Sequence, residues 1–249
     1  MLLTEPQPTP YDLSFHALGI PVRVHPMFWA VALLMGLSGN PEPAEMLTWV
    51  AAVFVSILVH ELGHALTARG FGADPRIVLY AFGGLAAYQG ARRTTLNQLL
   101  IVAAGPLAGF AFAAVLLAAI RAAGHQVLVD WNFRWVLPVL FEPFESDHLN
   151  RLIIDLLFIN IFWGLVNLLP VLPLDGGQIA REILGVFNPG DAVRQALWLS
   201  VIAAAVVAVL AFTRLNDRFI AIFFAYLAYT NYSTLRAYFG PGGGLGRWS

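Results

Sequence analysis

The residues best suited to chemistry lie in one five-residue run, His60-Glu61-Leu62-Gly63-His64. Side chains four positions apart share one face of a helix, so His60 and His64 could bind one metal ion together. Glu61 lies next to the first histidine, where its carboxylate can reach a water on that ion instead of ligating it. This spacing is typical of zinc hydrolases in which the glutamate is the general base. The alternative is an accidental match.

A zinc ion held by two imidazoles lacks a third protein ligand. The chain has no cysteine, so this ligand must be a histidine or a carboxylate. Asp175 is the best candidate, because Pro170 and Pro173 break the helix before it and Gly176 and Gly177 permit unusual backbone angles after it. Non-helical backbone at membrane depth persists only against protein or a water-filled cavity. Asp175 could also simply cap the next helix, and the two roles are compatible.

The composition indicates a membrane protein, since 59% of the residues are hydrophobic and only 12% are charged, against about 25% charged in soluble domains. The net charge of −1 gives no basic field for nucleic acid. A helix needs about 20 apolar residues to cross a bilayer. Five segments approach or meet this length: Met46–Thr67, Leu96–Ile120, Leu152–Leu172, Ala196–Thr213 and Phe219–Tyr232 with its continuation to Phe239. Pro26–Ser38 is counted as a further, first span. We expect a polytopic α-helical membrane protein with about six transmembrane helices. The first span is short unless it extends through Ile20–Val24.

A small membrane-associated β-sheet or hairpin is expected between the second and third spans. Arg76–Gln89 is rich in β-branched and aromatic residues and contains Gly83-Gly84. Leu13–His25 could add a strand to the same sheet. Otherwise the chain is predicted to form a single domain over residues 1–249, with flexible termini at about 1–19 and 240–249.

Arginine placement favours both termini in the cytoplasm, because the six-span topology puts nine of the 14 basic residues inside. We therefore expect a multi-pass protein of the cell membrane. From Arg69, a marker of the cytoplasmic interface, back to His60 is roughly 13 Å of helix at 1.5 Å per residue. The metal would lie below the surface but nearer the cytoplasm.

The two motifs together resemble those of the site-2 protease family of intramembrane zinc metalloproteases. H-E-x-x-H lies on one span, and a later span is followed by N-x-x-P-x-x-P-L-D-G-G, beginning at Asn167. The Gly83-Gly84 pair and Ala104-Gly105-Pro106 also resemble family features. The likeness covers roughly Ile20–Tyr232. No PDZ or CBS module of the kind found in many relatives is expected.

The resemblance implies helices around one zinc ion per chain, with His60, His64 and Asp175 as ligands and Glu61 as general base. Asn167 would lie near the catalytic centre or hold the substrate backbone. The implied substrate is a membrane protein with a single transmembrane helix, which must unwind before it is cut. Strands near Ile77–Tyr88 could pair with that unwound segment. The sequence does not specify the oligomeric state.

Two other functions remain open on the sequence. One is a catalytically silent relative, against which the intact Glu61 argues. The other is a metal-binding membrane protein or transporter without proteolytic activity, which usually needs a chain of polar residues through its spans. Glu182 is the alternative third ligand.

Several further polar or small residues are expected to have structural roles. Gly105 and Gly109 indicate close helix packing. Asp155 is expected at an interface or a helix start, and Asn160 is expected to bond a neighbouring helix. The remaining histidines lack ligand spacing and are expected to be structural or exposed: His16, His25, His125 and His148.

Overall fold

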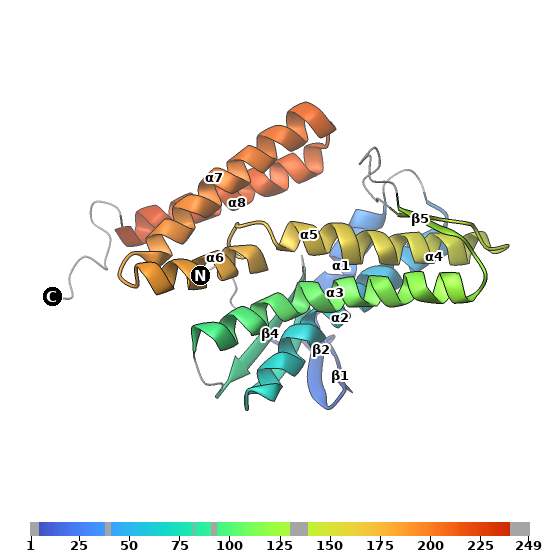
Figure 1. The fold of residues 1–249 in the computed structure, drawn as a ribbon, viewed down its shortest axis with the longest axis horizontal. Helices are drawn as coiled ribbons and strands as arrows, with labels where there is room; N and C mark the ends of the chain where they lie inside the picture. Colours follow the sequence, from blue (N-terminus) through green and yellow to red (C-terminus); the bar gives the residue numbers. More distant parts are fainter. Residues whose placement is uncertain (1–4, 38–40, 82, 91–93, 130–138, 240–249) are drawn as a thin grey trace. The chain divides into compact units, whose positions relative to one another are not determined.

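A computed structural model describes residues 5–37, 41–81, 83–90, 94–129 and 139–239 of the chain (Figure 1). These residues fall into two compact units. The first, here called the sheet unit, comprises Glu5–Arg93 and Ala103–Leu165. The second, the C-terminal unit, is built from Thr94–Val102 and Val166–Ser249. The terminal segment 240–249, predicted to be flexible, lies outside the described residues.

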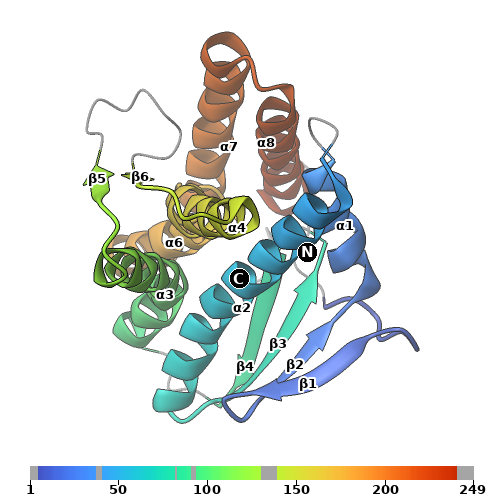
Figure 2. The ribbon, with the colours of Figure 1, turned by 90° about the vertical axis from the view of Figure 1, so that its right-hand side faces the viewer.

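The sheet unit contains a four-stranded sheet in the order β1-β2-β3-β4 (Figure 2). Its strands are β1 (Leu13–Ala17), β2 (Ile20–Val24), β3 (Asp74–Tyr80) and β4 (Gly83–Gln89). The β2 and β3 strands are parallel, and the other neighbouring pairs are antiparallel. The sheet predicted from Arg76–Gln89 and Leu13–His25 is thus confirmed.

The strand β2 settles two sequence predictions. Its alternate residues Ile20, Val22 and Val24 are buried, which is the period of two that a half-buried strand requires. Because Ile20–Val24 is extended, the proposed extension of the first span through it was wrong. The strand β1 pairs with β2, so part of the segment predicted to be flexible at about 1–19 is ordered.

Two helices connect the parallel strands β2 and β3. They are α1 (Pro26–Gly36) and α2 (Pro43–Gly70). His25 caps α1 by accepting a hydrogen bond from the Met27 amide at 3.1 Å, a structural role as predicted. The indole nitrogen of Trp49 on α2 donates to Ala32 O on α1 at 3.0 Å.

The other helices of the sheet unit pack beside α2. The long α3 (Thr95–Ala122) is followed by a two-stranded hairpin of β5 (Val127–Val129) and β6 (Val139–Phe141). A continuous helical stretch follows, made of α4 (Asp147–Phe158), the π-helical turn η1 (Ile159–Trp163) and α5 (Gly164–Asn167). A buried cluster joins the sheet, α1, α2 and α4 through side chains that include Val22, Phe28, Ile77 and Leu156.

The C-terminal unit contains α6 (Asp175–Phe187), α7 (Ala192–Leu210), the π-helical turn η2 (Ala211–Leu215) and α8 (Arg218–Phe239). Its core is formed by Val171, Ala204, Phe224 and Leu227. The core therefore joins α7 and α8 to the non-helical segment that precedes α6.

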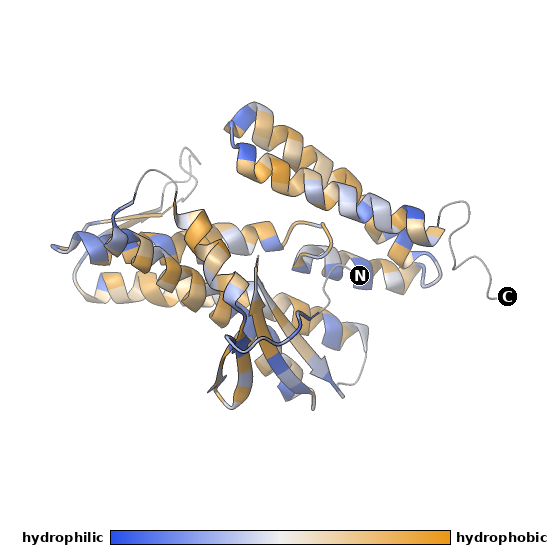
Figure 3. Cartoon of the chain, turned by 180° about the vertical axis from the view of Figure 1, so that it is seen from behind, coloured by the Kyte–Doolittle hydropathy of each residue, from blue (hydrophilic) through white to orange (hydrophobic). Residues whose placement is uncertain are grey.

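Four helical stretches are long and apolar enough to cross a membrane: Pro43–Gly70, Thr95–Ala122, Asp147–Asn167 and Ala192–Leu215. Most of their residues are hydrophobic (Figure 3). Large apolar side chains such as Val115 and Val209 are exposed along them, as lipid contact requires. Four of the six predicted spans are thus confirmed as candidate crossings. The other two correspond to α1, with 11 residues, and α8, with 22 residues.

Candidate metal centre

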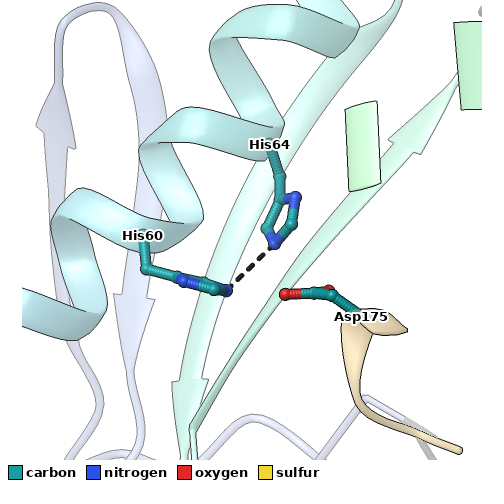
Figure 4. Close-up of side chains that lie close together, drawn as sticks. All are labelled: His60, His64 and Asp175. Carbon is teal, nitrogen blue, oxygen red and sulfur yellow. Dashed lines mark hydrogen bonds between the residues drawn. The ribbon is translucent and has the colours of Figure 1, made fainter. Parts of the chain in front are cut away.

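The α2 helix brings the rings of His60 and His64 together. Their Nε2 atoms lie 3.1 Å apart, and the ring planes meet at 81° (Figure 4). Two nitrogen ligands, each about 2.0–2.1 Å from a tetrahedral zinc ion, lie roughly 3.3 Å from one another. The observed spacing of the two imidazoles is close to what a shared zinc ion needs.

The glycine at position 105 of α3 leaves the space in front of these nitrogens open. A Cβ atom there would overlap His64 Nε2 and would lie 2.8 Å from His60 Nε2. Gly63 on α2 lies equally close to the backbone of α3, since a Cβ there would overlap Ala104 O. The two helices therefore pack at glycines, as predicted for Gly105.

Glu61 lies under the strand β4. Its side chain is buried, with 5% of the residue exposed. A Cβ atom on Gly84 would overlap the Cγ and Cδ atoms of Glu61. Glycine at this position thus lets the β4 backbone pass directly over the carboxylate.

One turn before the histidines, Ser56 makes a buried bond to a neighbouring helix. Asn160 Nδ2 donates to Ser56 Oγ at 2.8 Å and to Leu156 O at 2.8 Å. This confirms that Asn160 bonds a neighbouring helix. Ser56 was missed in the sequence, although its position four residues before His60 places it on the ligand face.

Asp175 lies in the C-terminal unit, as the first residue of α6, and is buried. The N-cap position belongs to Leu174, so Asp175 is not the capping residue that the sequence left as an alternative. A Cβ on Gly176 would overlap Leu168 O, and one on Gly177 would overlap Leu172 N. Both glycines therefore allow α6 to pack against the backbone that precedes it.

The remaining motif residues surround this non-helical segment. Asn167 is the last residue of α5 and is half-buried. Pro170 and Pro173 lie between α5 and α6, where the chain is not helical. As expected from the sequence, the two prolines coincide with the break in the helix.

His60, His64 and Asp175 offer two imidazoles and one carboxylate, a set of donors that could hold a metal ion (Figure 4). Within the described ranges, it is the one such group of three or more metal-ligating side chains. Nitrogen and carboxylate oxygen donors without thiolates suit zinc. The alternative ligand Glu182 instead forms an ion pair with Arg181 at 2.9 Å.

Asp155 is not at the helix start that the sequence allowed, since it is buried near the end of α4. Both Asp155 and His125 make local contacts. Asp155 pairs with Arg151 one turn earlier on α4 at 3.2 Å. His125 Nδ1 lies 3.0 Å from Glu142 O, beside the β5–β6 hairpin.

An H-E-x-x-H helix among apolar helices of membrane-spanning length defines the class of membrane-associated zinc metalloproteases. Within that class, the chain belongs to peptidase family M50, whose model matches residues 48–210. The resemblance to the site-2 protease family is thereby confirmed.

Known proteins of this kind are similar over much of the chain. A zinc metalloprotease of Methanocaldococcus jannaschii is 29% identical over 174 residues, which cover 68% of this chain and 44% of that protein. Stage IV sporulation protein FB of Bacillus subtilis is 29% identical over 162 residues, or 64% of this chain and 46% of that one. The chain thus spans less than half the length of these relatives.

The fold is also similar to that of a solved structure, a site-2 protease from Methanocaldococcus jannaschii. The TM-score is 0.58 at 23% identity, over 91% of this chain and 96% of the other. At this identity, the likeness concerns the fold.

Proposed function

We propose that the protein is an intramembrane zinc endopeptidase that cleaves a transmembrane segment of a membrane-protein substrate. One zinc ion per chain would be held by His60, His64 and Asp175, with Glu61 as the general base. The observation that carries the proposal is the 3.1 Å approach of the two Nε2 atoms in front of a glycine. Family membership supports the same activity.

The chemistry divides between the ion and the protein. When bound, zinc would act as a Lewis acid that polarises the scissile carbonyl and lowers the pKa of its bound water to about 7. Glu61 takes the proton of the attacking water and passes it to the leaving amine. Burial of Glu61 beside β4 holds its carboxylate in one place for both transfers.

Asp175 completes the set of ligands in this proposal because it supplies a carboxylate oxygen from a buried helix start. Gly176 and Gly177 permit the close packing that this helix start needs. Asn167 holds the substrate backbone or supports the transition state with its amide. Pro170 and Pro173 keep the connecting segment non-helical.

The substrate segment binds as an extended strand against β4. In the described sheet, β4 is an edge strand that pairs with β3 on one side. An unwound transmembrane segment that adds to the other edge satisfies its own backbone groups. Because Gly84 lies over Glu61, a substrate strand paired with this edge of β4 would have its scissile bond near the general base. A single transmembrane helix is the simplest substrate that can unwind in this way.

The chain crosses the cell membrane six times, with both termini in the cytoplasm, and forms one domain over residues 1–249. Parallel pairing of β2 and β3 supports this topology, because the chain leaves the sheet along α1 and returns to it along α2. If α2 crosses the bilayer, α1 and its flanking residues must first carry the chain across. The 22 residues of α8 rise about 33 Å, which is enough for a crossing.

The test is cleavage of a single-span substrate protein in liposomes by zinc-loaded wild type and Glu61→Gln. We expect the variant to keep its zinc and lose cleavage. The matched control is Glu182→Gln, which alters a carboxylate outside the proposed centre and should cleave as wild type does. Cleavage retained by Glu61→Gln would contradict the general-base role, and zinc flux into vesicles would favour a transporter.

A further inference from the structure

Two fully buried polar side chains meet one residue of the segment before α6. Ser200 on α7 and Asn231 on α8 are both 0% exposed. The Leu172 amide donates to Ser200 Oγ at 2.9 Å, and Asn231 Nδ2 donates to Leu172 O at 2.7 Å. Both polar groups of one backbone residue are therefore held by side chains from two different helices of the C-terminal unit.

The geometry of each side chain is fixed by its own helix. Ser200 Oγ donates to Ala196 O at 2.7 Å, which leaves its lone pairs for the Leu172 amide. Asn231 Nδ2 also donates to Leu227 O at 2.8 Å. Since both neighbours of this nitrogen are carbonyl oxygens, the amide of Asn231 has one reasonable orientation.

A buried polar side chain is costly to place in an apolar helix. We therefore expect Ser200 and Asn231 to have a specific role. Ser200 lies on a stretch long and apolar enough to span a membrane. Leu172 lies outside the helices, so its amide and carbonyl have no helical partner of their own. Without Ser200 and Asn231, both groups would be unpaired in an apolar environment.

The held residue lies three positions before Asp175, and short contacts link the two. A Cβ on Gly177 would overlap Leu172 N, so the first turn of α6 packs directly on the held peptide. The Leu174 amide donates to Val171 O at 2.8 Å. Gln178 Nε2 donates to Pro173 O at 3.2 Å. Fixing Leu172 thus fixes the start of α6.

We propose that Ser200 and Asn231 are positioning residues that hold the Leu172 peptide and thereby set the place of the Asp175 carboxylate. The inference rests on the proposed function, in which Asp175 is a zinc ligand. Groups that orient a metal ligand typically change metal affinity by 10–100-fold when removed.

The test measures zinc affinity by competition with a chelator, and the melting temperature of the metal-free protein. The variants are Ser200→Ala, which removes one oxygen atom and keeps a good helix former, and Asn231→Leu, which keeps the approximate volume. Each should weaken zinc binding about tenfold or more. Ser200→Thr retains the hydroxyl and should restore most of the affinity.

Matched controls come from α8 and from η2, the π-helical turn that continues α7. The hydroxyl of Thr213 bonds Val209 O at 2.7 Å, and that of Thr230 bonds Leu227 O at 3.0 Å. Both bonds stay within one helical stretch, so Thr213→Ala and Thr230→Ala should bind zinc as wild type does.

The variant Asp175→Ala distinguishes failure of the proposed ligand set from failure of the positioning role of Ser200 and Asn231. If Asp175→Ala binds zinc as tightly as wild type, the proposed ligand set is wrong. If Asp175→Ala loses zinc while Ser200→Ala keeps wild-type affinity, the positioning role is overturned. A lower melting temperature with unchanged zinc affinity would also overturn it, because the bonds would then serve stability alone. Ser200→Ala decides the question if Asn231→Leu does not fold.

Discussion

The backbone of Gly84 lies directly against the carboxylate of Glu61. A methyl group on this glycine would overlap the Cγ and Cδ atoms of the glutamate, whereas one on the adjacent Gly83 would meet nothing within 4 Å. The pair of glycines at the start of β4 therefore contains one position, Gly84, that contacts Glu61 and one, Gly83, whose added Cβ would have no neighbour within 4 Å.

Gly84→Ala should displace Glu61 and lower kcat by about 100-fold, the size of a typical general-base contribution. Zinc content should stay at one ion per chain, because the imidazoles are untouched. The measurement is cleavage of a single-span protein together with metal analysis. Gly83→Ala is the matched control and should cleave as wild type does. Equal rates for both variants would contradict the placement of Glu61 under β4.

Gly105→Ala should abolish zinc binding, because its Cβ would occupy the space in front of His60 and His64. Metal analysis after dialysis against zinc measures the effect. Gly70→Ala serves as control, since a Cβ there meets nothing within 4 Å. A zinc-replete Gly105→Ala protein would contradict the site described here.

Proline in β4 tests substrate docking at the edge of β4 that does not pair with β3 in the described sheet. Successive backbone N–H groups in a strand point to opposite edges, and proline removes the N–H. Of Leu85→Pro and Ala86→Pro, one should therefore break pairing with β3 and lower the melting temperature. The other should leave the fold intact and slow cleavage by at least tenfold, if each lost bond contributes about 1.5 kcal/mol. Two variants with no effect on cleavage beyond their loss of stability would rule out strand addition.

Acid should lower the stability of the N-terminal segment around Asp12 in the sheet unit. Hydrogen bonds from Thr9 and then from Arg23 lower the pKa of Asp12 from 3.8 to about 2. A carboxylate with a lowered pKa stabilises the fold above its unfolded pKa, and this contribution is lost as the pH falls through the folded value. After correction for the intrinsic pH dependence of exchange, amide protection near Asp12 should therefore fall between about pH 4 and pH 2. Asp12→Asn should remove most of this pH dependence, and an unchanged profile would contradict the assignment.

The residues of the candidate metal centre could be proposed from the sequence because they lie in short motifs. Helical periodicity alone predicts that His60 and His64 share one face of a helix. Pro170 and Pro173 predict the break in the helix before α6. The strands were also predictable from β-branched and aromatic residues. The first span was harder, because the apolar Ile20–Val24 fits a strand or a helix until its pairing is known.

Ser200 and Asn231 could not be found in the sequence, and the contacts of Gly84 and Gly105 could not be specified from it. Ser200 lies 28 positions from Leu172, and Asn231 lies 59 positions away. A single polar residue in an apolar helix has no spacing that reveals its partner. Gly84 and Gly105 carry no side chain, so the contacts that make them important appear only in three dimensions.

The most direct test of the central claim is an anomalous difference map at the zinc edge from crystals of the zinc-loaded protein. We expect one peak about 2.0–2.2 Å from the Nε2 atoms of His60 and His64 and from a carboxylate oxygen of Asp175. A peak elsewhere, or one bound by the two histidines with Asp175 out of reach, would contradict the account.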